Sequence, residues 1–347
     1  MRIHHVLLLT MLAGVSSACT DKPNSQADSA AGVDAATPPV FTPAELAMFA
    51  ALPADMRATP AGEPETQTSL GRALFYETLL SDGHDVSCNS CHALNAWGAD
   101  GRRVSLGHDG RAGTRNAPTV YNAAGHIAQF WDGRARDVEA QAQGPILNPI
   151  EMGMPDSTAV LAHLRASSMY TAAFRAAFPG ERQPITYSNV GRAIGAFERR
   201  LTTPSRWDTF LAGDSTALTA AERVGLRTFL DAGCQGCHSG AYVGGDRYMK
   251  AGVVNRWYSQ ADSGRYQLTK DTNDLFVFKV PSLRNIDRTG PYFHDGSTAN
   301  LTDAVRLMAH HQLGKELSAT QVQSIVTWLG ALTGTLPSRY IAYPPKP

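Results

Sequence analysis

The chain has 347 residues, and its 31 Lys and Arg balance 31 Asp and Glu, so the formal net charge at neutral pH is zero. With no net positive charge and no long basic run, nucleic acid is not expected as a partner. The length allows about two domains of ordinary size.

At the N-terminus, Arg2 precedes an apolar stretch from Val6 to Val15 that leads through small residues to Cys19. The stretch is too short for a spanning helix, so residues 1–18 are predicted to be a secretory signal peptide. Cleavage before Cys19 would leave a lipid-modified cysteine, although Ser16 stands where such sites usually have Leu. Ordinary cleavage nearby, without a lipid, is the alternative.

The segment that follows, residues 19–41, is rich in Ala, Asp, Ser and Pro. Such a composition buries too little apolar surface to fold, so we expect a disordered tether. Signal peptide and tether together predict a periplasmic protein, which would be tethered to a membrane if Cys19 carries a lipid. No later segment of the sequence is apolar over a length that could span a bilayer.

The ordered part is predicted to begin at Thr42. Thr42 and Glu45 form a capping box, and Pro43 takes the first helical position. A second helix is predicted from about Thr68 to Leu80. Its inward-facing apolar residues would be Leu70, Leu74 and Phe75.

The sequence contains one five-residue motif twice, as Cys88-Asn89-Ser90-Cys91-His92 and as Cys234-Gln235-Gly236-Cys237-His238, and the two copies hold four of the five cysteines. In such a motif two cysteines on one turn form thioethers with the vinyl groups of a haem, and the histidine ligates the iron. A four-cysteine zinc site would not need the histidines, and a disulfide rarely bridges so short a loop. The chain is therefore predicted to bind two covalent c-type haems, attached through Cys88, Cys91, Cys234 and Cys237 and ligated by His92 and His238.

Between about residues 98 and 156 the chain is rich in Gly, Pro and Asn and shows little periodicity, so we expect a long irregular segment there. Long irregular segments in compact domains usually carry function. Helices are predicted to resume at Ser157–Arg165 and Tyr187–Leu201. The apolar stripe of the latter is Val190, Ile194 and Phe197.

The second half of the sequence repeats this plan. Thr219–Glu222 is another capping box, and Gly233 would end that helix just before the second haem motif. A loop-rich stretch follows, in which Leu275–Val280 could pair briefly as a strand. Ser318–Gln321 then caps a final helix.

Each half thus contains a helix, a haem motif, a long loop and a closing helix, the arrangement by which a small c-type cytochrome encloses its haem. We predict a mainly α protein with two cytochrome c-like haem domains and long irregular loops. The first domain would span residues 42–203 and the second residues 204–337, followed by a tail at 338–347.

The second axial ligand of each iron decides between electron transfer and catalysis. His108 lies in a glycine-flanked loop after the first motif, where a ligand could leave the iron; a surface histidine is the alternative. Met308 is the candidate for the second iron, and Met ligation raises the potential of a haem. The alternatives there are a core methionine, or His310 or His311 as the ligand.

Several further motifs carry a resemblance to a known family. The chain contains Gly107-His108, Arg115-Asn116-Ala117-Pro118-Thr119, Gln129-Phe130-Trp131-Asp132-Gly133-Arg134, Asn148-Pro149-Ile150-Glu151-Met152-Gly153-Met154-Pro155, Leu283-Arg284-Asn285, Pro291-Tyr292-Phe293-His294-Asp295-Gly296 and Gln312-Leu313-Gly314. Together with the haem motifs, they make the chain from about residue 42 to residue 337 resemble the bacterial di-haem cytochrome c peroxidases.

The resemblance implies different roles for the two haems. His92 and His108 resemble the ligands of a low-potential N-terminal haem at which peroxide reacts. His238 and Met308 resemble the ligands of a high-potential C-terminal haem that accepts electrons.

The resemblance also implies roles for residues around the haems. Trp131 matches the family's tryptophan between the haems, Glu151 its acid/base carboxylate, and Gln141 a polar residue of the peroxide pocket. His294 matches a histidine near the second haem that bonds a propionate rather than the iron.

A calcium ion is a further implication of the resemblance. Asn116, Thr289 and Pro291 match positions that ligate calcium between the domains, the last two through backbone carbonyls, and calcium prefers such oxygen ligands. Because relatives are commonly dimers, the resemblance also implies a homodimer.

The implied activity is that of an enzyme, a cytochrome c peroxidase that reduces hydrogen peroxide to water with electrons from a small cytochrome c or copper protein (cupredoxin). Reduction of the C-terminal haem would release His108 from the other iron, which makes His108 a gate. One rival is a related di-haem oxidase that matures another protein, but such relatives have Tyr in place of Met308. The other rival is a non-catalytic electron-transfer protein, which would not need Glu151.

Overall fold

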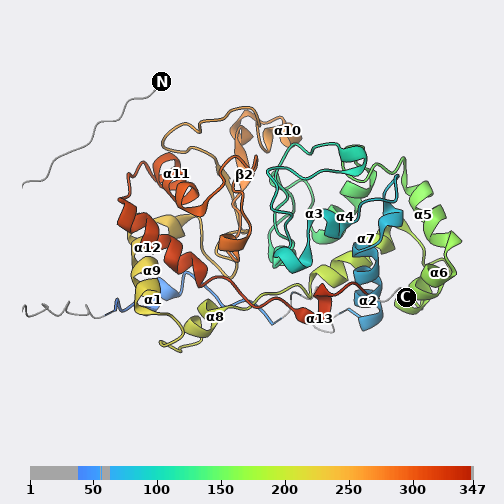
Figure 1. The fold of residues 1–347 in the computed structure, drawn as a ribbon, viewed down its shortest axis with the longest axis horizontal. Helices are drawn as coiled ribbons and strands as arrows, with labels where there is room; N and C mark the ends of the chain where they lie inside the picture. Colours follow the sequence, from blue (N-terminus) through green and yellow to red (C-terminus); the bar gives the residue numbers. More distant parts are fainter. Residues whose placement is uncertain (1–37, 55, 57–62, 345–347) are drawn as a thin grey trace, which may run out of the picture. The chain divides into compact units, whose positions relative to one another are not determined.

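The computed structural model describes residues 38–54, 56 and 63–344. The predicted signal peptide, Cys19 and most of the predicted tether lie outside these residues. Within the described part the fold is mainly helical, as predicted, with one two-stranded sheet (Figure 1). Short helices α1 (Pro43–Leu46) and α13 (Ser338–Ile341) stand near its two ends. None of the helices described there has the length and apolarity that a bilayer crossing requires.

In the first half of the described chain, helix α2 crosses helix α7 at a glycine. The helices of this half are α2 (Glu65–Phe75), α3 (Cys88–Cys91), α4 (Val138–Leu147), α5 (Ser157–Ala166), α6 (Ser168–Ala177) and α7 (Tyr187–Glu198), with 3-10 turns at Thr78–Leu80, Leu94–Ala96, His108–Gly110 and Ala123–Gly125. A Cβ at Gly71 of α2 would stand 1.8 Å from the carbonyl oxygen of Ala193 in α7. Glycine therefore lets the two backbones approach this closely.

The second half has the same kind of crossing, between α9 and α12. Its helices are α8 (Arg206–Leu211), α9 (Ala220–Ala232), α10 (Tyr266–Thr269), α11 (Leu301–Leu313) and α12 (Ala319–Gly330), with 3-10 turns at Cys234–Gly236, Thr272–Asp274 and Ile286–Arg288. A Cβ at Gly225 of α9 would stand 2.0 Å from the carbonyl oxygen of Ser324 in α12. In both halves the helix before the haem motif thus packs closely on the closing helix.

Two hydrophobic clusters hold these helices together. The first gathers side chains between residues 70 and 201, including the fully buried Phe75 and Phe197 at the α2–α7 crossing. The second is built mainly from residues 207–332 around Trp207 and Trp328, whose ring centroids lie 5.6 Å apart. Because burial of one large apolar side chain contributes about 1.5–3 kcal/mol, each cluster is a major source of stability for its half.

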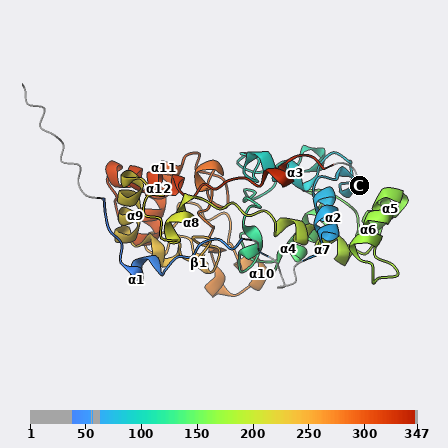
Figure 2. The same ribbon diagram turned by 90° about the horizontal axis from the view of Figure 1, so that it is seen from below.

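The two ends of the described chain cross over between the halves (Figures 1 and 2). Just after α1, Phe49 packs on Trp207 of the second cluster, with ring centroids 5.2 Å apart. In α13, Tyr340 packs on Phe197 of the first cluster, with centroids 5.8 Å apart. The segment around α1 was predicted to belong to the first haem domain, but its Phe49 packs on the second half of the chain.

The three predicted capping boxes are confirmed. At Thr42, Thr219 and Ser318 the hydroxyl accepts a hydrogen bond from the third backbone N–H of the helix. In each case the Glu or Gln three residues on accepts a bond from the capping residue's own N–H. These pairs act within one turn, so sequence alone identifies them.

Other predicted elements are also confirmed. The helix predicted at 157–165 appears as α5. The helix predicted at 187–201 appears as α7, which begins at Tyr187 as predicted but ends at Glu198, three residues early. The strand predicted within 275–280 appears as β2 (Val277–Lys279), which pairs antiparallel with β1 (Tyr248–Lys250). The helix predicted from Thr68 to Leu80 is too long, since α2 stops at Phe75. Glu77 accepts a hydrogen bond from the N–H of Leu79 and starts a separate 3-10 turn.

The expectation of an irregular segment from residue 98 to residue 156 is wrong near its end, which contains the helix α4. Asp137 caps α4 by accepting a backbone N–H three residues on, at 2.8 Å. Gly144 and Pro145 near the end of α4 obscure its pattern in the sequence, because both are poor helix formers. The missed helix bears on function because it carries Gln141.

Candidate active site

The first haem motif forms one helical turn that fixes the orientation of its histidine. α3 spans the motif as far as Cys91. The Nδ1 atom of His92 lies 3.3 Å from the carbonyl oxygen of Gly98. Because a carbonyl only accepts, Nδ1 carries the proton in this contact, and the lone pair of Nε2 is free for a metal. Burial lowers the pKa of His92, which favours the neutral imidazole that metal ligation needs.

The second motif repeats this geometry with different residues. Gly233 ends α9 in the left-handed conformation, with φ 93°, directly before Cys234. The Nδ1 atom of His238 lies 3.3 Å from the carbonyl oxygen of Val243, which again leaves Nε2 free. Burial lowers the pKa of His238 to about 4. Two neutral imidazoles in the same tautomer, each beside two cysteines that form no disulfide, fit two covalently attached haems.

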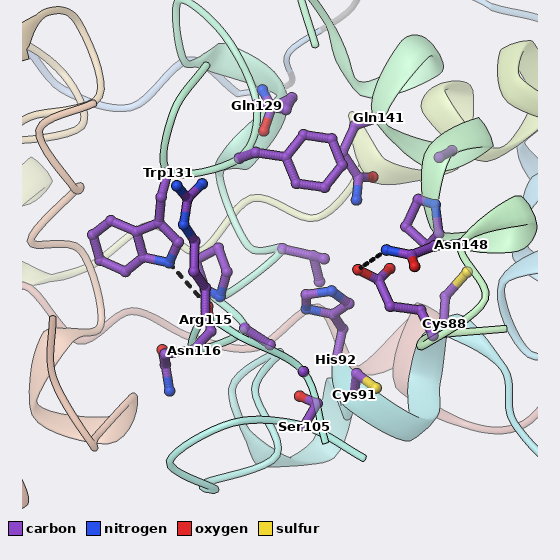
Figure 3. A pocket seen from close by; sticks show the side chains of 18 of the residues that line it. Cys88, Cys91, His92, Ser105, Arg115, Asn116, Gln129, Trp131, Gln141 and Asn148 are labelled. Carbon is purple, nitrogen blue, oxygen red and sulfur yellow. Dashed lines mark hydrogen bonds between the residues drawn. The ribbon is translucent and has the colours of Figure 1, made fainter. Parts of the chain in front are cut away.

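A cavity of about 490 Å³ lies beside the first motif (Figure 3). Its volume falls within the range of about 300–1,000 Å³ of ligand and cofactor sites. Cys88, Cys91 and His92 lie along one part of its lining, so the donor set around it is the one that a c-type haem requires. The cavity is also lined by four residues that the family resemblance singles out: Asn116, Trp131, Gln141 and Glu151.

The carboxylate of Glu151 is anchored in this cavity by a turn that follows α4. The N–H of Glu151 donates to the carbonyl of Asn148 at 3.0 Å. The side-chain amide of Asn148, which Figure 3 labels, donates to Glu151 Oε1 at 2.9 Å. Burial raises the pKa of Glu151, while the charge of Arg134 and the Asn148 bond oppose that shift. A partly buried carboxylate whose pKa is raised holds its proton more tightly than an exposed one and can serve as a proton-exchanging group.

Trp131 is bonded to both halves of the described chain. Its indole N–H donates to the carbonyl of Asn116 at 2.9 Å. Its own carbonyl accepts the N–H of Lys279 in β2 at 2.8 Å. The ring lies 6.3 Å, between centroids, from His294. The side chain therefore stands where residues of the first and second haem regions meet.

His108 docks on the segment that carries Glu151. The N–H of His108 donates to the carbonyl of Glu151 at 2.7 Å. Its ring packs on Gly153, where a Cβ would come within 2.4 Å of ring atoms. Gly107 lines the cavity beside the first motif, whereas the His108 ring rests on Gly153. The role of His108 as an iron ligand stays a prediction.

The predicted calcium ligands belong to neighbouring segments. The N–H of Asn116 donates to the carbonyl of His294 at 2.8 Å. His294 is close in sequence to Thr289 and Pro291, the other two predicted ligands. The Asn116 amide nitrogen donates to the carbonyl of Arg102 at 3.0 Å, so the amide oxygen is turned the other way. Among the described residues, no three His, Cys, Asp or Glu side chains gather where they could hold a metal ion. A calcium ion at Asn116 would therefore depend on neutral oxygens.

Met308 lies half-buried on α11, next to the two histidines that compete with it as ligands. His310 pairs with the exposed carboxylate of Glu316. His311 donates from Nδ1 to the carbonyl of Asn255 at 3.1 Å, so its ring orientation is set by that bond. Both bonds use Nδ1 and leave Nε2 free, as in His92 and His238, so Met308 as the ligand of the second iron stays a prediction.

Comparison with known proteins identifies the family. Residues 65–216 match the profile of a family described as di-haem cytochrome c peroxidase. The chain is 43% identical over 295 residues to cytochrome c551 peroxidase of Pseudomonas aeruginosa, an alignment that covers 82% of this chain and 84% of that protein. It is 42% identical over 279 residues to cytochrome c551 peroxidase of Nitrosomonas europaea, covering 79% and 82% respectively. The chain belongs to the di-haem cytochrome c peroxidase family.

The fold agrees with this assignment. The crystal structure of a MauG-like protein associated with microbial copper homeostasis matches with a TM-score of 0.74 at 29% identity, covering 84% of this chain and 97% of that one. As a di-haem cytochrome c peroxidase the protein is an oxidoreductase that acts on peroxide and carries two c-type haems. The family and the enzyme class predicted from the sequence are confirmed.

Sequence reasoning missed two neighbours of Glu151 in this peroxidase. Asn148 bonds its carboxylate, and the charge of Arg134 opposes the rise in its pKa that burial causes. Both residues lie inside motifs that the chain shares with the family, but neither motif predicts that their side chains meet at the carboxylate of Glu151. A polar residue three positions before Glu151 in a Pro-rich turn was the one local signal available.

Proposed function

We propose that this di-haem peroxidase reduces hydrogen peroxide to water in the cavity beside the first motif, with two electrons delivered to the second haem by a small cytochrome c or cupredoxin. The observation that carries the proposal is that one cavity joins the haem-binding residues to the anchored carboxylate of Glu151. Each peroxide consumes two electrons and two protons and forms two water molecules.

Two cytochrome c-like domains, residues 42–203 and 204–337, would hold the haems. His92 and His238 would ligate the irons through the free Nε2 atoms, with His108 and Met308 as the second ligands. When bound, the first haem supplies the redox-active iron at which the O–O bond is cleaved.

Glu151 would act as the acid/base group. It takes a proton from one peroxide oxygen and returns it to the other, which becomes the leaving water. Asn148 holds the carboxylate in place through its 2.9 Å bond. Gln141, on the lining of the same cavity, offers an amide that can hydrogen-bond peroxide. Trp131, bonded to both halves, would lie on the electron route between the domains.

His108 would control access to the first iron. It would leave the iron for a released position, and its contact with Gly153 and its N–H bond to the Glu151 carbonyl tie it to the segment that carries the acid/base group. Reduction of the second haem would favour that position, which makes His108 one element of a two-state switch.

Other parts of the proposal concern the setting of the enzyme. A calcium ion would bind at Asn116, Thr289 and Pro291. The chain would be exported to the periplasm by residues 1–18, with Cys19 as a lipid anchor, and it would form a homodimer. These proposals depend on the sequence features and on the family.

The test uses purified protein with both haems attached. The higher-potential haem alone is reduced, with calcium present, and one equivalent of hydrogen peroxide is added while the haem spectrum is recorded. We expect rapid oxidation, and turnover once a reduced cytochrome c is supplied. The fully oxidised protein is the matched control for the His108 switch. Absence of any reaction with peroxide in the half-reduced protein would contradict the proposal and favour a pure electron carrier.

A further inference from the structure

A second cavity, of about 450 Å³, adjoins the cavity that contains Glu151. The two cavities are neighbours because five residues line both of them: Phe130, Arg134, Pro145, Asn148 and Glu151. The second cavity is also lined by Arg136, whose side chain is 88% exposed, and by the exposed Gly144. It therefore reaches the protein surface, and Glu151 stands between this outer space and the haem-binding residues.

The wall between the cavities contains a stack of two side chains. The guanidinium carbon of Arg134 lies 3.4 Å from the centre of the Phe130 ring. Arg134 Nη1 donates to both carboxylate oxygens of Asp132 at 3.1 Å, and the buried Asp132 also accepts a bond from Arg115 at 2.7 Å. The stack is thus anchored at its Arg134 end. The Phe130 ring at the other end lines both cavities.

Phe130 has a backbone that keeps its ring in the wall. Its φ is +66°, in the left-handed region that residues other than glycine rarely adopt. The turn is closed by the N–H of Gly133, which donates to the Phe130 carbonyl at 3.3 Å, and by the N–H of Gln129, which donates to the carbonyl of Ala135 at 2.7 Å. A ring held in an uncommon conformation between two cavities suggests a role in separating them.

We propose that the second cavity is the entrance through which peroxide reaches Glu151, and that the stack of Phe130 and Arg134 limits the size of the peroxide admitted. The inference rests on the proposed function, because it takes the first cavity as the peroxide site. Hydrogen peroxide is small and can exchange hydrogen bonds with the guanidinium as it passes. An alkyl hydroperoxide carries an apolar group that must displace the ring.

Gly144 supplies a way to test the entrance without touching the catalytic group. A Cβ at this position of α4 would stand 3.5 Å from Phe130 Cζ, an ordinary van der Waals contact. Larger side chains at residue 144 would project beside the ring and fill the outer cavity. Residue 144 precedes Pro145 in the helix, so a larger side chain gains helix propensity but meets the proline ring, and the thermal unfolding of each variant is measured beside that of the wild type.

The experiment compares Gly144→Leu, Gly144→Ala and Phe130→Ala in the holoenzyme. The matched control is Gly330→Leu on α12, where a new Cβ meets no atom within 4 Å. Each variant is made both in the wild-type chain and with His108→Gly, so that the iron site is open whether or not His108 leaves it. Stopped-flow measurements give rate constants for hydrogen peroxide, tert-butyl hydroperoxide and cyanide, which binds haem iron without peroxide chemistry.

For Gly144→Leu we expect association rates of hydrogen peroxide and cyanide to fall about tenfold or more, within the one to three decades usual among variants of one site. The cyanide dissociation constant should stay unchanged, because a blocked entrance slows binding and release equally. Gly144→Ala should have a smaller effect, and Gly330→Leu none. Phe130→Ala should raise the rate with tert-butyl hydroperoxide relative to hydrogen peroxide by about tenfold, a preference change typical of altered pocket size.

Unchanged association rates in Gly144→Leu would overturn the entrance. So would slower cyanide association with an unchanged dissociation rate, because the loss would then be one of affinity and not of access. An unchanged ratio between the two peroxides in Phe130→Ala would overturn the size limit. Cyanide separates these outcomes from failure of the proposed function: an enzyme that binds cyanide but does not react with peroxide refutes the function and still reports on the entrance.

Discussion

Replacement of Glu151 by Gln tests the acid/base role with little structural change. The amide has nearly the shape of the carboxylate, and its oxygen can still accept the bond from the Asn148 amide that now measures 2.9 Å. What the variant loses is the ability to take up and return a proton. General acid–base catalysis contributes about 10²–10⁴-fold, so we expect the rate of reaction with peroxide to fall by that factor. This corresponds to about 3–5 kcal/mol in the activation barrier.

The pH dependence gives a second signature of Glu151. Burial raises the pKa of its carboxyl group above the ordinary value of 4.5, and Arg134 and Asn148 only partly offset this. The proton-accepting form is the ionised one, so the wild-type rate should decline as the pH falls through that raised pKa. In Glu151→Gln this decline should vanish, because the titrating group is gone.

The assay is a stopped-flow measurement of the second-order rate with peroxide, from weakly acid to weakly alkaline pH, on holoenzyme in which only the higher-potential haem is reduced. The matched control is Glu181→Gln, the same substitution at a surface residue that pairs with Arg192. The control should behave as the wild type. A Glu151→Gln rate within a few-fold of the wild-type rate, or an acid decline that persists in the variant, would refute the assignment.

Three further predictions concern stability and the switch. The guanidinium of Arg284 is 1% exposed and donates to both Asp208 oxygens, at 2.7 and 2.9 Å. Asp208→Ala would leave this buried charge without its carboxylate, so the free energy of unfolding, measured in guanidinium chloride, should fall by about 3–5 kcal/mol. His108→Gly should react with peroxide while fully oxidised, and a continued need for prior reduction would mean that His108 does not gate the iron. Burial raises the pKa of Glu198 to about 8. The folded protein therefore holds a proton on Glu198 that the unfolded chain has already released, and the free energy of unfolding falls as that proton is lost, by about 1.4 kcal/mol between pH 7 and 9. In Glu198→Gln, which does not titrate, denaturation curves should no longer show this fall.

The features that the sequence predicted well depend on short-range chemistry. A capping box joins residues three apart, and a haem motif places two thiols and an imidazole within one turn. The structure adds why the imidazoles are ready for metal: carbonyls of Gly98 and Val243 fix the tautomers of His92 and His238. Those carbonyls lie only five or six residues beyond the histidines, but no side chain marks them in the sequence.

The features that the sequence missed depend on tertiary contacts or on conflicting local preferences. Helix α4 was missed because Gly144 and Pro145 weaken its pattern, although Asp137 was a readable cap. The crossing of the chain ends was missed because Phe49 and Tyr340 find their partners far away in sequence, on Trp207 and Phe197. An apolar residue shows that it will be buried but not on which half of the molecule.

The two haem regions attach their cofactors in the same way and differ in what surrounds the free imidazole nitrogen. Near His92 the cavity lining includes the carboxylate of Glu151, which also lines an outer cavity. Near Met308 the neighbouring His311 is bonded to the backbone and packed on Trp257, with ring centroids 4.9 Å apart. Cleavage of peroxide needs proton exchange and access for a small molecule, whereas electron transfer proceeds best when the ligands stay in place. The contrast is what we expect if peroxide reacts in the first region and electrons enter at the second, as we propose.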